Sequence, residues 1–134
     1  MVDMRRAVAG TVVGLALIAT AGCDEKVKEV PASSIVGVWR STCDGTLTVA
    51  EGGTFTAESI RTETEGTKGT GPGTWRIEKN GSTSPSPVSL DVKLDDSNQW
   101  LSLYFIKRKG QLTMLQYFGD PDNNDTCVFT MRQG

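Results

Sequence analysis

The chain of 134 residues contains no histidine. Histidine is the commonest general acid or base near neutral pH and the commonest transition-metal ligand in proteins. Its absence argues against most hydrolases and most metalloenzymes, because the serines and threonines then lack a partner base. We therefore expect that the protein is not an enzyme and that it holds no metal and no cofactor.

Long apolar runs are also scarce. Residues 7–19 carry no charge, but a membrane-spanning helix needs about 20 apolar residues. Arg5 and Arg6 precede this run, and the small residues 20–22 follow it. A basic start, a short apolar run and small residues are typical of a secretory signal peptide. The pattern predicts that residues 1–22 are such a peptide rather than a transmembrane helix.

The junction Thr20-Ala21-Gly22-Cys23 resembles the lipobox of bacterial lipoproteins. In that family a diacylglycerol is attached to the cysteine thiol and the chain is cut just before the cysteine. The resemblance implies that Cys23 carries the lipid, with acyl chains such as palmitate, on the extracytoplasmic face of the cell membrane. Thr20 departs from the family, which usually has an aliphatic residue there. The alternative is an ordinary signal peptide in which Cys23 has no role, and Arg5-Arg6 leaves both the general and the twin-arginine export routes open.

Neither sign of charge is in large excess. Loss of residues 1–22 removes Asp3, Arg5 and Arg6, which lowers the basic residues from 14 to 12 and the acidic residues from 16 to 15. A net charge near −3 with interspersed signs argues against binding nucleic acid and against electrostatic docking on anionic lipid. We expect a monomer that reaches the membrane only through its N-terminal lipid.

The mature chain divides into two parts. Residues 23–33 mix charges of both signs with a proline and few apolar residues, which predicts a solvated, lipid-anchored tether. Residues 34–134 are enough for one domain with one core.

Short apolar runs alternate with turn residues throughout this domain, which predicts strands rather than helices. The strands are expected at 35–40, 46–49, 54–60, 73–78, 88–94, 100–106, 111–118 and 127–132. Polar segments at 62–72, 79–87 and 119–126 are expected to be exposed loops. About eight short strands favour a β-sandwich or a closed antiparallel barrel, and closure would remove exposed edges. We expect an all-β protein with a single up-and-down barrel.

Only three cysteines are present. Lipidation of Cys23 would leave Cys43 and Cys127, which are expected to form a disulfide in an oxidising compartment. The bridge would join the first strand to the last and contribute roughly 4 kcal/mol in the chain-entropy model. The alternatives are two reduced buried thiols or a catalytic thiol, which no histidine is present to activate.

Gly37-Val38-Trp39 on the first expected strand matches the G-x-W motif of the lipocalins and the wider calycin group. The resemblance implies a barrel in which Gly37 and Trp39 close one end, Arg132 packs across the tryptophan, and a small apolar ligand lies inside. A direct pairing of the two cysteines would place Arg132 opposite Val38 instead, on the other face of the sheet, unless a β-bulge intervenes.

The segments 115–122 and 127–130 resemble the ending of many small actinobacterial lipoproteins, with an aromatic strand, a Gly-Asp-Pro-Asp turn and a final Val-Phe strand. This second resemblance implies the same fold and compartment, and it brings no known activity.

A set of large apolar residues is expected inside the barrel. Its members fill the core in one interpretation and line a cavity for a small apolar ligand in the other. The candidate ligand-binding residues are Trp39, Phe55, Trp75, Leu103, Phe105, Met114 and Phe129. We expect a small-ligand-binding lipoprotein; the alternative is a filled barrel that binds an envelope protein through its loops.

Two groups of carboxylates invite catalytic or metal-binding interpretations. Residues 120–125 contain three aspartates and are similar to the start of a calcium loop, but Asp, Asn and Pro also favour turns. Glu58, Glu63 and Glu65 would suit glycoside hydrolysis only if a rigid element positioned them. We interpret the first group as a hairpin turn and the second as part of a solvated loop.

Overall fold

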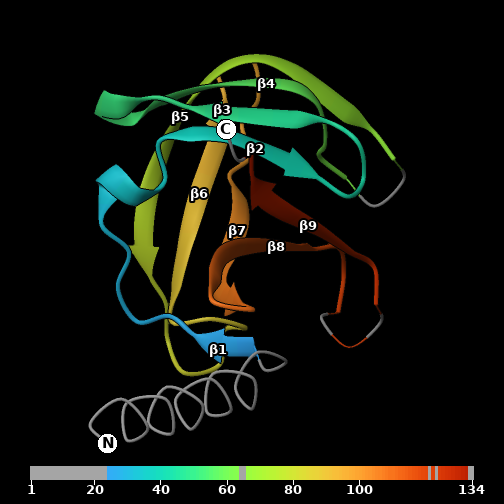
Figure 1. The fold of residues 1–134 in the computed structure, drawn as a ribbon. Coiled ribbons are helices and arrows are strands. Elements are labelled where there is room, and N and C mark those ends of the chain that lie inside the picture. The colour runs from blue at the N-terminus through green and yellow to red at the C-terminus, as the bar shows by residue number, and fades with distance from the viewer. Residues whose placement is uncertain (1–23, 64–65, 121, 123, 133–134) are drawn as a thin grey trace, which may run out of the picture.

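Eight strands of the computed structural model, β2 to β9, close into an antiparallel barrel, and the short strand β1 joins its wall (Figure 1). The structure describes residues 24–63, 66–120, 122 and 124–132, so the predicted signal peptide and Cys23 lie outside the described residues. The strands are β1 Asp24–Lys26, β2 Gly37–Ser41, β3 Thr46–Val49, β4 Thr54–Arg61, β5 Lys68–Lys79, β6 Val88–Leu94, β7 Leu101–Arg108, β8 Gln111–Tyr117 and β9 Thr126–Met131. Two short 3₁₀ helices, Ala32–Ser34 and Glu51–Gly53, complete the described elements.

The barrel follows the order of the chain. Each strand from β2 to β9 pairs with its neighbour in sequence, and β9 pairs with β2 to close the wall. The connections β4–β5, β6–β7 and β8–β9 therefore share one end of the barrel, and β3–β4, β5–β6 and β7–β8 share the other. The predicted all-β, up-and-down barrel is confirmed.

The predicted loop 62–72 is too long, because β5 begins at Lys68. The glycines that suggested a loop have separate structural reasons. A Cβ atom at Gly69 would lie 2.5 Å from Cδ1 of Leu94, so the leucine side chain would have to shift, whereas Gly71 has open space at its Cβ position and a φ of +136° that favours glycine. A bulge between Ala57 and Ile60 adjusts the β4–β5 register here. Lys68 to Pro72 are therefore strand, and the loop is shorter.

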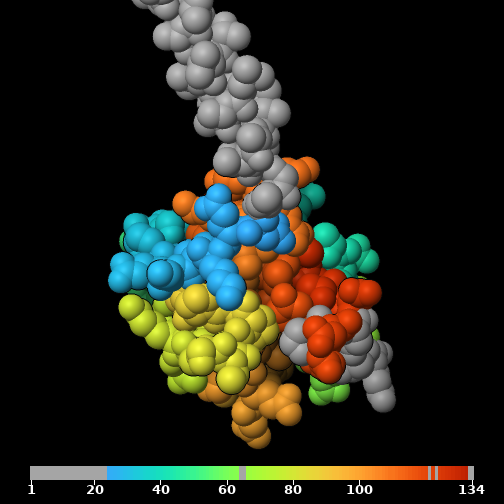
Figure 2. All heavy atoms as spheres, turned by 90° about the horizontal axis from the view of Figure 1, so that it is seen from below, coloured from blue at the N-terminus to red at the C-terminus, as the bar shows by residue number. Residues whose placement is uncertain are grey.

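The prediction of a solvated tether is wrong for its first part. Asp24–Lys26 pair with Ile106–Arg108 at the end of β7, and Arg108 forms hydrogen-bonded ion pairs with Asp24 at 2.9 and 3.0 Å. Val27 and Val30 are buried in the main core cluster. The mixed charges of this segment suggested a solvated tether, but its two valines pack against the barrel core. Figure 2 shows this blue segment lying across the lower face of the molecule.

The disulfide between Cys43 and Cys127 is formed, with a Cα–Cα distance of 5.5 Å. It lies where β2 and β9 close the barrel, and the amide of Thr42 donates to the carbonyl of Val128 nearby at 2.9 Å. The predicted covalent link between the first and the last barrel strand is confirmed.

The proposed packing of Arg132 across Trp39 is wrong. The β2–β9 register runs without a bulge and places Met131 opposite Trp39, while the amide of Arg132 bonds to the carbonyl of Val38. Arg132 is exposed, whereas Trp39 is fully buried and donates from Nε1 to the carbonyl of Ile35 at 2.9 Å. Met131 therefore covers the tryptophan, and it also packs over Gly37, whose φ of +145° favours glycine.

The interior of the barrel is packed with side chains. Six of the seven candidate ligand-binding residues are at most 2% exposed and belong to one core cluster: Trp39, Phe55, Leu103, Phe105, Met114 and Phe129. Trp75 is half-buried against the same cluster. Such packing favours the filled-core interpretation of these residues, as expected for a small eight-stranded barrel.

Candidate functional site

The wall of the barrel opens between β7 and β8. Their pairing runs from Arg108 and Gln111 to Tyr104 and Leu115. Beyond that point each strand keeps only the partner on its other edge, β6 beside residues 101–103 of β7 and β9 beside residues 116–117 of β8. Residues 101–103, on the β7 side, and residues 116–118, on the β8 side, form no ladder pairs with each other. We call this gap the wall opening.

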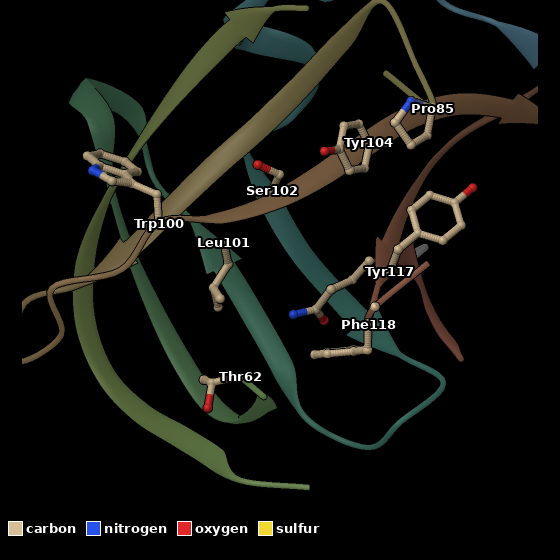
Figure 3. A pocket seen from close by; sticks show the side chains of 10 residues that line it. Thr62, Pro85, Trp100, Leu101, Ser102, Tyr104, Tyr117 and Phe118 are labelled. Atoms are coloured by element: carbon tan, nitrogen blue, oxygen red, sulfur yellow. The ribbon is translucent and has the colours of Figure 1, made fainter. Parts of the chain in front are cut away.

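The wall opening contains a pocket of about 400 Å³ that is open to solvent. Figure 3 shows its side chains, which come from both diverging strands and from neighbouring connections. The pocket is lined by Thr62, Pro85, Trp100, Leu101, Ser102, Tyr104, Gln116, Tyr117, Phe118 and Gly119. A volume of this size is in the usual range for small-molecule sites.

Gln116 is the buried polar residue of this pocket. It is 3% exposed and lies on the same face of β8 as Met114, which belongs to the core. Its Nε2 donates a hydrogen bond of 2.8 Å to the carbonyl of Arg61. Its Oε1 is buried and accepts no hydrogen bond from any described residue. An unsatisfied buried acceptor costs about 1–3 kcal/mol of stability. A hydrogen-bond donor from a bound molecule would remove this cost.

An ion pair holds the deep end of the pocket in place. Arg61, at the end of β4, donates from its two terminal nitrogens to the two carboxylate oxygens of Asp125, at 2.7 and 2.9 Å. These bonds are the main reason that the pKa of Asp125 is lowered and that of Arg61 is raised, and desolvation opposes both shifts. The Arg61 guanidinium also lies 3.9 Å from the ring centre of Phe118. The arginine therefore fixes Phe118 and, through its carbonyl, Gln116.

Two tyrosines form the outer part of the opening. The rings of Tyr104 on β7 and Tyr117 on β8 lie 5.9 Å apart at 49°, and Figure 3 shows them side by side. Burial, the largest cause, raises the pKa of Tyr117 above its usual 10.0. Its hydroxyl therefore stays protonated well above neutral pH and both donates and accepts hydrogen bonds.

Trp100 stands at the rim of the pocket. It is 38% exposed, and the Arg76 guanidinium lies 4.0 Å from its ring centre. This cation–π contact orients the indole on the surface. An exposed, oriented tryptophan beside a pocket is a common anchor for a ligand or a partner.

A second pocket, of about 200 Å³, adjoins the first because Thr62 and Leu101 line both. It adds polar and charged groups at the β4–β5 end of the barrel: Glu63, Lys68, Asp96, Ser97 and Gln99. By contrast, the ten residues that line the first pocket carry no charge. The site is a neutral aromatic opening that continues into a polar groove.

The predicted ligand-binding residues lie elsewhere. None of the seven lines the pocket of the wall opening, because their side chains fill the core; Leu103 belongs to the unpaired part of β7, but its side chain packs in the core cluster. Two sequence signals point to the site. Gln116 interrupts the inward apolar series of β8, and the opening gathers both tyrosines of the chain.

The carboxylate groups act locally in the structure. The amide of Asp122 donates to Oδ1 of Asp120 at 3.0 Å, as in an Asx turn, and Asp125 pairs with Arg61. Among the described residues no group of three histidine, cysteine or acidic side chains is arranged to hold a metal ion. The hairpin-turn interpretation of residues 120–125 fits these contacts.

No described helix is long and apolar enough to cross a membrane. Comparisons with protein-family models, with curated proteins and with solved structures give no match for this chain.

Proposed function

We propose that this chain is an exported, lipid-anchored protein that binds a small molecule in the wall opening between β7 and β8. The single observation that carries the binding proposal is the buried, unpartnered Oε1 of Gln116 inside an aromatic pocket of about 400 Å³. Buried polar atoms in folded proteins almost always have a partner, so an exception needs an explanation. A ligand that donates a hydrogen bond explains it.

The proposal moves the ligand from the barrel interior to its wall. The residues first considered for an internal cavity are packed against one another as core. The lining of the wall opening combines aromatic rings with hydroxyl and amide groups. The ligand is therefore amphipathic rather than purely apolar.

The anchor follows from the sequence before β1 and fits the position of that strand. A lipid on Cys23 would stand one residue before Asp24, which is paired with Arg108 beside the β7–β8 turn. That end of the barrel would then face the bilayer. The connections β4–β5, β6–β7 and β8–β9, together with the polar groove, would face away from it and leave the pocket accessible.

The anchor is tested by fractionation and mass spectrometry of the protein expressed in its own host. The expected result is a chain that begins at Cys23, carries acyl chains and stays in the membrane fraction. A Cys23→Ser variant should leave that fraction. A wild-type chain that is exported without acyl chains would contradict the anchor and favour an ordinary signal peptide.

The ligand is tested by native mass spectrometry of the processed protein, purified without denaturation. We expect a mass excess that disappears on unfolding. Ser102→Trp places a bulky ring in the opening and should abolish the excess, whereas Thr48→Trp, at an exposed position of β3 outside this pocket, is the matched control and should keep it. An excess that survives Ser102→Trp would contradict binding in the wall. Absence of any excess would favour the alternative, a protein-interaction module that works through its loops.

A further inference from the structure

We infer that the ligand of the wall opening is a neutral saccharide. This inference rests on the proposed function, because it names the chemical class that the same pocket takes. It follows from three properties of the lining residues: their flat apolar surfaces, their hydrogen-bonding groups and their lack of charge.

The flat surfaces come from the aromatic side chains. Trp100, Tyr104, Tyr117 and Phe118 line the pocket from both diverging strands (Figure 3). Aromatic rings provide large, rigid contact areas at low conformational cost, and tyrosine and tryptophan also offer a polar edge. A pyranose ring presents a face of C–H groups to such surfaces while its hydroxyls remain at the ring edge.

The hydrogen-bonding groups require a ligand that donates. Gln116 is 97% buried and offers an acceptor, Oε1, that no described residue satisfies. A purely apolar ligand would leave this acceptor unpaired, and a site built around a hydrogen bond strongly rejects analogues that lack the matching group. The hydroxyls of Ser102, Tyr104 and Tyr117 line the same pocket and suit a ligand with several hydroxyls.

The charges around the pocket disfavour anionic ligands. None of the ten lining residues is charged, so a buried cation or anion would have no partner in the pocket. The connections at residues 62–67, 95–100 and 118–125 contain only acidic charged residues. Their negative potential disfavours carboxylated, sulfated or phosphorylated sugars.

The dimensions fit one or two sugar rings. The first pocket, of about 400 Å³, is open to solvent and adjoins the second, of about 200 Å³, through Thr62 and Leu101. Ser97 and Gln99 in the second pocket offer hydroxyl and amide groups. A second ring would extend along this groove.

The test is a titration of the processed, isotope-labelled lipoprotein in a detergent without a sugar head group. The probes are the neutral disaccharides maltose, cellobiose and N,N′-diacetylchitobiose, with glucuronic acid as the charged probe and toluene as the apolar probe. We expect at least one neutral disaccharide to shift the Gln116 side-chain amide and the Trp100 indole N–H. Glucuronic acid and toluene should bind at least tenfold more weakly.

Variants separate the site from general effects. Gln116→Met keeps the length of the side chain and should weaken sugar binding at least tenfold, while Gln111→Met, exposed on the same strand, should leave it unchanged. Trp100→Ala at the exposed rim should also weaken binding at least tenfold. Trp100 is not part of the core cluster, so this variant provides the test if Gln116→Met does not fold.

Four results would overturn the inference. Toluene binding that is tighter than every sugar, or sugar binding unaffected by Gln116→Met and Trp100→Ala, would exclude a saccharide site in the opening. If no disaccharide binds while native mass spectrometry still finds a copurified ligand lost in Ser102→Trp, the ligand class is wrong and the proposed function stands. If neither experiment finds a ligand, both proposals fail.

Discussion

Gly73 illustrates how one residue sets the spacing of the barrel wall. It pairs with Phe55, and a Cβ atom at this position would lie 2.3 Å from the carbonyl oxygen of Lys93 and 2.5 Å from the Phe55 ring. The phenyl ring of the buried Phe55 therefore lies directly against the β5 backbone. Only glycine permits this approach.

Gly73→Ala should destabilise the protein by about 1–3 kcal/mol, because the added methyl group overpacks the core. Gly81→Ala is the control, since nothing lies within 4 Å of its Cβ position. Denaturant unfolding of both variants measures the difference. Equal stability of the two would show that β4 and β5 are not as closely packed as described.

The residues around Trp39 give a second prediction. Met131 lies opposite Trp39 and against Gly37, whereas Arg132 is exposed. Met131→Ala should cost about 1–3 kcal/mol, less than a fully buried methionine because the side chain is partly exposed. Arg132→Ala should change the unfolding free energy by less than about 0.5 kcal/mol. A larger loss for Arg132→Ala in thermal or denaturant unfolding would restore the lipocalin-like role of the arginine.

At the scale of elements, β1 is attached by a short ladder and one ion pair. A hydrogen bond from Arg108, the largest cause, lowers the pKa of Asp24 and raises that of Arg108, with desolvation opposing both. A carboxylate with a lowered pKa in the folded state contributes stability above its unfolded pKa of about 3.9 and loses it as the pH falls further. The attachment of β1 should therefore weaken below about pH 4.

Asp24→Asn should produce the same weakening at neutral pH. The amides of β1 should exchange faster with deuterium than in the wild type, while the exchange of β6 and β8 stays unchanged. Glu29→Gln is the matched control, because its pair with Lys79 at 3.7 Å is highly exposed. Equal exchange of β1 in Asp24→Asn and the wild type would mean that the β1–β7 ladder and the buried Val27 and Val30 hold the segment without the ion pair.

The elements also mark the limit of sequence-based prediction. Strict alternation in residues 88–94 and 46–49 identifies β6 and β3 with the correct bounds. The start of β5 was missed because its glycines and proline resemble a loop, although they pair across a bulge. Strand β1 was missed because its sequence is polar and its partner is the edge that β7 presents beyond β6.

At the scale of the whole molecule, the disulfide holds the closure of the barrel. It joins Cys43, two residues after the end of β2, to Cys127 at the start of β9 across 84 residues of sequence. Cys43→Ser/Cys127→Ser should lower the unfolding free energy by about 4 kcal/mol, since the unfolded chain regains the entropy of a long loop. Denaturant unfolding of the double variant beside the oxidised wild type gives the value. A loss below about 1 kcal/mol, no more than a surface contact gives, would contradict this role.

The alternation of apolar residues predicts the fold, but it does not predict the candidate site. Alternation places Trp39, Phe55 and Phe129 inside, and the structure has them there. The wall opening arises because the β7–β8 ladder ends at Tyr104 and Leu115 while β7 stays paired with β6 on its other edge, and no local sequence pattern marks where that ladder ends. Gln116, a polar residue at an inward position of β8, is the sequence feature that indicates the wall opening.

Binding in the wall opening can be checked by a crystal structure of the processed protein, purified from its own host without denaturation. We predict electron density for a bound molecule between residues 101–103 and 116–118, with a donor atom within hydrogen-bonding distance of Oε1 of Gln116. Density inside the barrel between Phe55, Phe105 and Phe129 would contradict it. So would an uninterrupted β7–β8 ladder that extends to Phe118 and closes the opening.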